Sequence, residues 1–179
     1  MIETAIKWDN QNGGKEKMEP GITYRPIGQI HTPFTDPKGM PIQPAGARDV
    51  EGRVEVFPEF RAGLIDLEGF SHLILLYHFH RSKGYTLEVV PYMDSTTRGV
   101  FATRAPRRPN PIGLSVVRLD RIEDGILFVR DVDILDGTPL LDIKPYVPEF
   151  DSPIPPIRIG WLAEHRHRAA SHRADGRFA

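Results

Sequence analysis

A short loop rich in arginine and proline carries the clearest chemistry in this sequence. Arg104, Arg107 and Arg108 fall within five residues of one another. Three prolines punctuate the same stretch: Pro106, Pro109 and Pro111. Proline fixes its own φ and pushes the preceding residue into extended backbone, so the loop is stiff and loses little entropy when it binds. The pattern predicts a preformed site for a carboxylate or a phosphate.

The same loop has a plainer interpretation, in which it only connects two strands and its arginines are solvated. Asn110 lies between two of the prolines and has both donors and an acceptor. Its amide can hold a backbone turn or contact a nucleobase edge. Both interpretations remain open at the level of the loop alone.

Histidines on one strand-like segment, SHLILLYHFHR, suggest a second kind of chemistry. His72, His78 and His80 share strand parity, so His78 and His80 are neighbours on one face. Two imidazoles can begin a metal site, but the local sequence supplies neither a third ligand nor outer partners. A hydrogen-bonded histidine at a barrel mouth is the alternative, and we expect no bound metal.

Carboxylates gather in residues 131–146, DVDILDGTPLLDIKPY. Asp136 precedes Gly137, which is a turn signal, so its side chain can simply cap that turn. Asp142 and Lys144 share strand parity and can form a surface ion pair of small energetic value. A catalytic role for either acid depends on what the acceptor is.

The elements that must position these groups are mostly strands. Runs bounded by glycine or proline predict them at 27–32, 52–57, 72–80, 86–90, 99–102, 114–123, 126–134 and 140–143. Asp124 and Gly125 predict a two-residue hairpin turn, because a type I′ turn needs positive φ at both positions. Only residues 59–67 and 159–170 have a helical pattern.

These elements predict an all-β fold, a small single-sheeted β-barrel with long Pro-rich loops and little helix. The chain has 179 residues with 17 prolines and 16 glycines. We expect a flexible leader over residues 1–20, the barrel domain over 21–150, and a basic C-terminal tail over 151–179. The tail is expected to be solvated or disordered, with an RNA-contacting arm as the alternative.

Composition narrows the classes of protein. Hydrophobic residues make up 40% and charged residues 26%, as in ordinary globular domains, and the net charge of -1 gives no global basic field. There are no cysteines, and the longest apolar run is too short to cross a bilayer, which predicts a cytoplasmic protein. The sequence contains neither the Rossmann signature GxGxxG nor the P-loop signature GxxxxGK[ST]. Any nucleotide-like ligand must therefore be held by loops on a barrel.

Several segments closely resemble the TsaA-like family, the TrmO-type tRNA methyltransferases that use S-adenosylmethionine. They are IGQIHTPF (27–34), Gln43-Pro44, FSHL (70–73), GVFATRAPRRPNPIGLS (99–115) and LDGTPLLDIKPY (135–146). The resemblance covers about residues 24–150. It implies a β-barrel fold, a homodimer and S-adenosylmethionine as the cofactor.

The resemblance also implies which residues contact the cofactor. They are Gln43, Pro44, Ala45, Phe79, His80, Arg104, Leu114, Arg130, Asp131, Val132 and Asp133. Chemically, Phe79 offers a surface for adenine and Arg104 a partner for the methionine carboxylate. Asp133 offers an acceptor for the ammonium group or a ribose hydroxyl. Ala45, Arg130 and Asp131 lie in no distinctive motif.

The acceptor implied by the resemblance is N6 of threonylcarbamoyl-adenosine beside the anticodon of tRNA. A ureido nitrogen is a poor nucleophile until its proton is removed, so a carboxylate base is expected, with Asp142 as the first candidate and Asp136 as the second. Anticodon loops are bound through stacking and phosphate contacts. The expected RNA-side residues are Arg107, Arg108, Asn110 and Tyr146, with Tyr92 as a further stacking partner.

The interpretation is therefore an S-adenosylmethionine-dependent tRNA (adenine-N6) methyltransferase. Two alternatives remain. One is a non-catalytic module that binds S-adenosylmethionine or RNA, and the other is a methyltransferase that acts on a small molecule.

Overall fold

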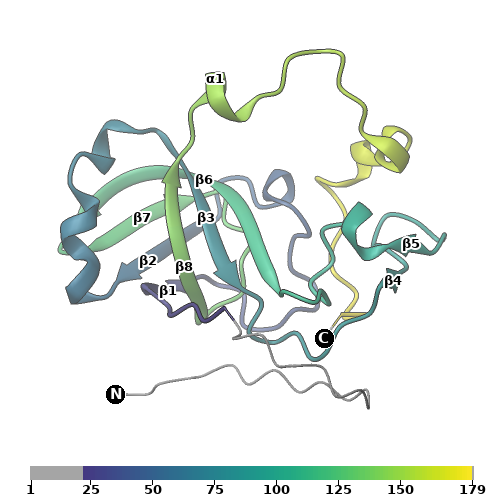
Figure 1. Cartoon of the computed structure of the whole chain (residues 1–179), viewed down its shortest axis with the longest axis horizontal. Coiled ribbons are helices and arrows are strands. Elements are labelled where there is room, and N and C mark those ends of the chain that lie inside the picture. The colour runs from purple at the N-terminus through teal and green to yellow at the C-terminus, as the bar shows by residue number, and fades with distance from the viewer. Residues whose placement is uncertain (1–21, 179) are drawn as a thin grey trace.

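Six antiparallel strands form a closed barrel in the computed structural model, which describes residues 22–178 (Figure 1). The expected leader over residues 1–20 lies outside the described range. The strands run around the barrel in the order β1 (Gly28–His31), β2 (Glu51–Val56), β7 (Ile126–Arg130), β6 (Ile112–Glu123), β3 (His72–His78) and β8 (Thr138–Pro145). The predicted all-β barrel is confirmed.

The barrel interior is filled by the buried residues of alternating strands. On β3 the buried positions are Leu73, Leu75 and Tyr77, which face inward, while their neighbours are only partly buried. Successive side chains of a strand point to opposite faces, so this alternation sends every second residue into the core. Leu127 and Val54 meet them from the other side of the barrel. Burial of this apolar face holds the barrel closed.

The predicted hairpin between β6 and β7 is present, with φ of 51° at Asp124 and 80° at Gly125. The following strand is shorter than the sequence indicates. It ends at Arg130 rather than at residue 134, because Asp131 has a left-handed φ of 66° and its carboxylate accepts a hydrogen bond from the Asp49 backbone at 2.8 Å. Residues 131–137 therefore leave the sheet as a loop before β8.

A second, two-stranded sheet stands beside the barrel and consists of β4 (Glu88–Val89) and β5 (Arg98–Gly99). The expected strand over 99–102 is wrong beyond Gly99. Val100–Ala102 form a 3₁₀ turn, closed by a hydrogen bond from the Thr103 backbone to the Val100 carbonyl. Val100 is thereby buried in a small apolar cluster with Val89 and Ala105.

Helical structure is short throughout the described residues. The expected helix at 59–67 is a 3₁₀ turn over Pro58–Leu64, followed after Asp66, with φ of 66°, by another over Leu67–Gly69. Further 3₁₀ turns cover Pro44–Gly46, Gly160–Ala163 and Arg166–Arg168, and the single α-helical turn is α1 (Pro148–Asp151). Within residues 22–178, no helix has the length and apolar character needed to cross a membrane.

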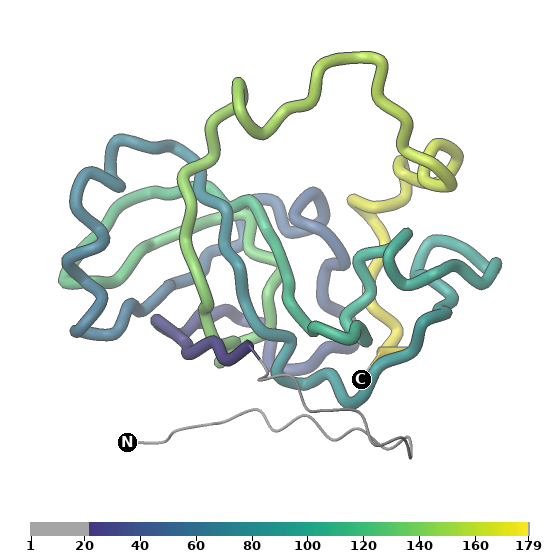
Figure 2. The backbone as a smooth tube through the Cα atoms, in the orientation of Figure 1, coloured from purple at the N-terminus to yellow at the C-terminus, as the bar shows by residue number. Residues whose placement is uncertain are grey.

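From Trp161 on, the tail folds back against the rest of the molecule, so the expectation of a solvated or disordered end is wrong for this part, while residues 151–160 are all exposed. We call residues 160–178 the C-terminal segment; in Figure 2 it is the yellow tube that passes beside β4 and β5. At one end the Trp161 indole donates to the Ala102 carbonyl at 2.8 Å. Further along, Ala174 exchanges backbone hydrogen bonds with Gly39 and Met40, and Phe178 packs against the cluster around Val100.

Candidate ligand pocket at the barrel mouth

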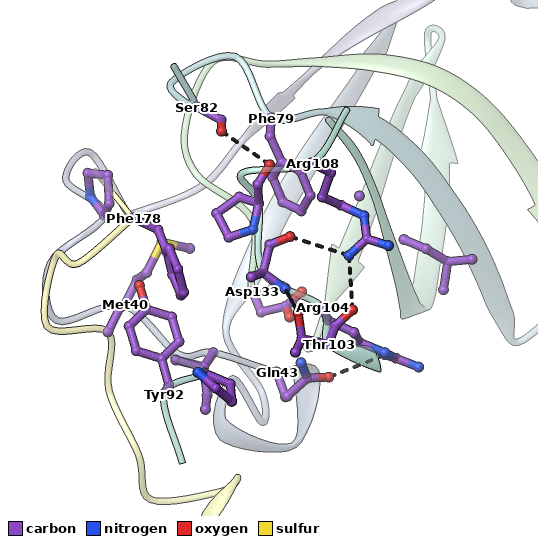
Figure 3. A pocket seen from close by; sticks show the side chains of 18 of the residues that line it. Met40, Gln43, Phe79, Ser82, Tyr92, Thr103, Arg104, Arg108, Asp133 and Phe178 are labelled. Carbon is purple, nitrogen blue, oxygen red and sulfur yellow. Dashed lines mark hydrogen bonds between the residues drawn. The ribbon is translucent and has the colours of Figure 1, made fainter. Parts of the chain in front are cut away.

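A pocket of about 810 Å³ opens where the barrel meets the two-stranded sheet. Cavities of roughly 300–1,000 Å³ are typical of small-molecule sites. Its walls come from the end of β3, the start of β6, the loops around residues 37–43, 101–108 and 133–138, and the C-terminal segment. Figure 3 shows Gln43, Arg104 and Asp133 together at one side of the pocket, with Tyr92 and Phe178 at the other.

Six of the predicted cofactor residues line this pocket: Gln43, Phe79, His80, Arg104, Leu114 and Asp133. They come from five separate stretches of sequence, which the barrel closure brings together. Their contact with a cofactor stays a prediction, but their common location is a finding.

The other five predicted cofactor residues lie outside the pocket lining. Pro44 and Ala45 belong to the neighbouring 3₁₀ turn, and Val132 is fully buried in the core. Arg130 pairs with Asp120 at 2.6 Å and with Glu51 at 3.1 Å on the barrel exterior. The Asp131 carboxylate holds the Asp49 backbone. These contacts place Arg130 and Asp131 at the end of β7, on the outside of the barrel.

The arginine loop is held rigid by one of its own arginines. Arg108 Nη1 donates to the carbonyl oxygens of Thr103 at 2.9 Å and Val100 at 3.1 Å. These bonds add to the stiffness that the prolines supply. Arg104 projects from this frame, and its Nη1 donates to Gln43 Oε1 at 3.2 Å across the pocket wall (Figure 3). Arg108 is therefore a structural clamp for Arg104.

The remaining RNA-side candidates are spread over the surface. Arg107 is partly buried and Asn110 is exposed, both in the same loop. Tyr146 follows β8 and packs edge-on against His72, at the opposite end of β3 from the pocket. The structure thus separates Tyr146 from the arginine loop. Binding of RNA by all four residues stays a prediction.

Asp133 is the acid that the structure brings to the pocket. Ser115 Oγ donates to Asp133 Oδ1 at 2.6 Å, and the Tyr77 hydroxyl lies 3.0 Å from Ser115 Oγ. Burial raises the pKa of Asp133 to about 6, against the smaller opposing effects of the Ser115 hydrogen bond and the Arg104 charge. Burial also raises the pKa of Tyr77, which stays neutral.

The two predicted catalytic acids lie elsewhere. Asp142 is on β8, four residues or about 13 Å beyond Thr138 at the pocket, and pairs with Lys144 at 2.7 Å. Asp136 accepts a hydrogen bond from the Thr32 backbone at 3.0 Å and lies 3.5 Å from the His31 ring. Asp142 matches its plainer interpretation as a surface ion pair. Asp136 instead contacts the distant Thr32 and His31 rather than a group of its own turn. Neither carboxylate is among the residues that line the pocket.

The raised pKa of Asp133 makes a prediction about stability. The pKa of the Asp133 carboxyl is about 4 in the unfolded chain and about 6 in the folded protein. Its contribution to the free energy of unfolding is therefore complete below pH 4 and is lost as the pH rises through 6. We expect Asp133→Asn, which cannot ionise, to be more stable than the wild type at pH 8 by up to about 3 kcal/mol. The difference should vanish near pH 4.

Denaturant unfolding of both proteins between pH 4 and pH 8 measures this effect. Asp124→Asn, in the exposed hairpin turn, is the matched control and should show no such trend. A stability difference between Asp133→Asn and the wild type that stays constant with pH would contradict the assignment of a raised pKa.

Of the three predicted histidines, His80 lines the pocket, and it does so as a hydrogen-bonding group. His80 Nδ1 lies 3.3 Å from Thr138 Oγ1, whose own hydrogen is donated to the Leu135 carbonyl at 2.6 Å. Burial lowers the pKa of both His78 and His80, which favours neutral rings. Among the described residues, no group of three or more potential metal ligands is found.

Sequence reasoning missed the wall formed by the C-terminal segment. Trp161, Leu162 and Phe178 line the pocket from a stretch that is otherwise polar and basic. The two aromatic residues were the available signal, because a solvated tail has little use for a tryptophan. Their docking partners lie more than fifty residues away, which local patterns do not report.

Fold and pocket together define a class: small closed β-barrels with a ligand pocket built from loops at the barrel mouth. The family model described as the tRNA-methyltransferase O N-terminal domain, TrmO_N, matches residues 29–152. The chain belongs to the TrmO family, as the resemblance in its motifs predicts. The C-terminal segment lies beyond the residues that the family model matches.

Individual relatives agree with this membership. A protein of Pyrococcus abyssi named "Probable S-adenosyl-L-methionine-binding protein" is 64% identical over 157 residues, which are 88% of this chain and 85% of that one. The human tRNA (adenine(37)-N6)-methyltransferase is 35% identical over 147 residues, covering 78% of this chain and 33% of the human protein. The crystal structure of TrmO from Pseudomonas aeruginosa superimposes with a TM-score of 0.66 at 41% identity. The match covers 79% of this chain and 63% of the Pseudomonas aeruginosa chain.

Proposed function

We propose that this protein is a methyltransferase that uses S-adenosylmethionine and methylates N6 of adenosine in tRNA, with threonylcarbamoyl-adenosine beside the anticodon as the acceptor. The observation that carries the proposal is one pocket that combines an exposed arginine, a partly buried acid and an aromatic and apolar lining. The arginine suits the carboxylate of the methyl donor, the aromatic and apolar lining suits its adenine ring, and the acid can accept the proton that the acceptor nitrogen loses. Family membership and the names of the relatives support the same cofactor.

The residues present fit the donor chemically. Arg104 would pair with its carboxylate, and Phe79 would pack against its adenine. Gln43 and His80 supply polar contacts at the same wall. When bound, S-adenosylmethionine supplies an electrophilic methyl group on a leaving group that needs no acid. The work left to the protein is to bind, align and desolvate the two reactants.

Transfer of a labelled methyl group tests the proposal. The protein is incubated with methyl-labelled S-adenosylmethionine and two tRNA substrates, one carrying threonylcarbamoyl-adenosine and one carrying unmodified adenosine, and each product is digested to nucleosides. We expect label only in the first, in a nucleoside methylated at N6. Label in unmodified adenosine would contradict the proposed acceptor. Binding of the donor without transfer to any tRNA would favour the non-catalytic module.

We further propose that the working unit is a homodimer in the cytoplasm, where its tRNA acceptor is found. An apolar surface is exposed on the connection between β8 and the C-terminal segment: Phe150 is 84% exposed and Ile154 is 90% exposed, and Ile157 is exposed on the same connection. Ile112 and Leu114 on the outer face of β6 are also exposed. A second copy would cover such side chains.

Sedimentation at micromolar concentration checks this prediction. The wild type is expected to have the mass of two chains, and Ile154→Asp combined with Phe150→Asp is expected to give monomers, because each buried carboxylate would oppose pairing. The matched control places aspartate at the exposed Ser171 of the C-terminal segment. A monomeric wild type would contradict the dimer without touching the proposed chemistry.

A further inference from the structure

Three side chains form a continuous hydrogen-bonded chain from the core to the pocket. Tyr77 comes from β3, Ser115 from β6, and Asp133 from the loop after β7. The donor-acceptor distances are 3.0 Å from Tyr77 to Ser115 and 2.6 Å from Ser115 to Asp133. Gly113 makes room for this arrangement, since a Cβ at that position would lie 2.2 Å from the Tyr77 ring. The network is therefore built into the barrel wall.

The direction of the hydrogen bonds follows from the number of hydrogens. Ser115 has one hydroxyl hydrogen and donates it to Asp133 Oδ1, so Tyr77 must donate to Ser115. Both hydroxyl dipoles then point toward the carboxylate and fix its position. Oδ1 keeps its bond to Ser115 while the second oxygen, Oδ2, can accept a proton. Buried Tyr77 stays neutral and serves as a donor only.

We infer that Asp133 is the general base of the methyl transfer, and that Ser115 and Tyr77 position it. The inference rests on the proposed function. The N6–H proton of the acceptor passes to Asp133, while the N6 electron pair forms a bond to the transferred methyl carbon. The carbon–sulfur bond of the donor breaks and its electron pair stays on sulfur, which becomes a neutral thioether. Asp133 later loses its proton to solvent.

The surroundings of Asp133 suit this task. A base works best when its pKa lies near the working pH, and burial raises that of Asp133 to about 6. The charged group that acts on it most directly is Arg104 of the arginine loop. The other ionisable groups of the pocket are Tyr77, His80, Arg81, Tyr92, Arg108 and Arg166. His80 is the rival base, but burial lowers its pKa and so makes it a weaker base than an ordinary histidine.

Single-turnover methyl transfer to tRNA carrying threonylcarbamoyl-adenosine, measured from pH 5 to pH 9, tests the inference. For the wild type we expect a rate that rises with pH and then levels. In Asp133→Asn the plateau rate should be roughly 10²- to 10⁴-fold lower, and the rate should no longer rise with pH. Ser115→Ala keeps the carboxylate but removes a hydrogen bond that lowers its pKa, so the rise should shift to higher pH. A purely structural serine would leave that midpoint in place.

Calorimetry with S-adenosylmethionine and with its demethylated product separates catalysis from binding. Asp133→Asn should bind both with wild-type affinity, within about threefold, and its thermal unfolding should confirm that it is folded. Asp124→Asn, far from the pocket in the hairpin turn, should match the wild type in every measurement. Asp133→Glu, which keeps a displaced carboxylate, should keep part of the rate and a pH rise.

Three results would overturn the assignment. The first is an Asp133→Asn variant with the wild-type rate and pH rise. The second is selective loss of affinity for the cationic donor with a normal rate at saturation, which would make Asp133 its counter-ion. The third is loss of the rise in His80→Gln or in Asp142→Asn but not in Asp133→Asn. A wild type that transfers no methyl group would instead overturn the proposed function, and the assignment with it.

Discussion

Replacing Arg104 with alanine is expected to weaken the binding of S-adenosylmethionine and of its demethylated product roughly 10- to 100-fold. A hydrogen bond to a charged group contributes about 1.5–3 kcal/mol, and each 1.4 kcal/mol corresponds to a factor of ten in affinity. Both ligands carry the same amino-acid carboxylate, so both should lose affinity equally. Arg104→Lys should restore part of the loss, because lysine keeps the charge but not the planar fork.

Titration calorimetry at pH 8 measures this effect with Asp133 ionised in all variants. Arg121→Ala is the matched control, since Arg121 pairs with Glu123 beside the β6–β7 hairpin turn and is exposed. It should bind both ligands like the wild type. Equal affinity of Arg104→Ala and wild type would remove Arg104 from the cofactor site. Loss of affinity for only one of the two ligands would show that it contacts something other than the shared carboxylate.

Removal of the C-terminal segment is expected to have the second large effect. A chain ending at Ile159 loses the Trp161, Leu162 and Phe178 wall and opens one side of the pocket. Phe178 also covers Val100 and Val89, so the two-stranded sheet loses part of its small core. Burial of apolar surface holds these parts together at about 25 cal/mol per Å². We expect cofactor affinity to fall at least tenfold and the melting temperature to drop.

Point substitutions separate the wall from the fold. Trp161→Ala removes the indole hydrogen bond to the Ala102 carbonyl and a large apolar surface, and should reproduce most of the loss in affinity. His167→Ala changes an exposed side chain of the same segment and should have no effect. Affinity that survives both the truncation and Trp161→Ala would mean that the barrel loops alone hold the ligand.

The sequence by itself determined the barrel and the positions that are local in character. Alternating burial on β3 follows directly from the alternating pattern of its residues, and the Asp124–Gly125 turn follows from its need for positive φ. The arginine loop was also predictable, because proline acts on its immediate neighbours. In each case the physical cause spans only a few residues.

The tertiary structure alone decided which acid reaches the pocket. Asp133, Asp136 and Asp142 lie within ten residues of one another and look equivalent as a sequence. The left-handed Asp131 ends β7 early, and Ser115 of β6 then holds Asp133 at the pocket wall. Asp142 stays in β8 and pairs with Lys144. Strand parity predicts which face of the sheet a side chain lies on. It does not predict which end of the barrel carries the pocket.

The C-terminal segment shows the same limit over a longer distance. Its basic composition describes a solvated tail, and nothing local predicts that Ala174 joins the backbone of Met40 or that Trp161 reaches Ala102. These contacts close loops of many residues, and their free energy comes from burial against surfaces made elsewhere in the chain. Short-range patterns therefore specified the strands and turns, and long-range packing specified which side chains share the pocket.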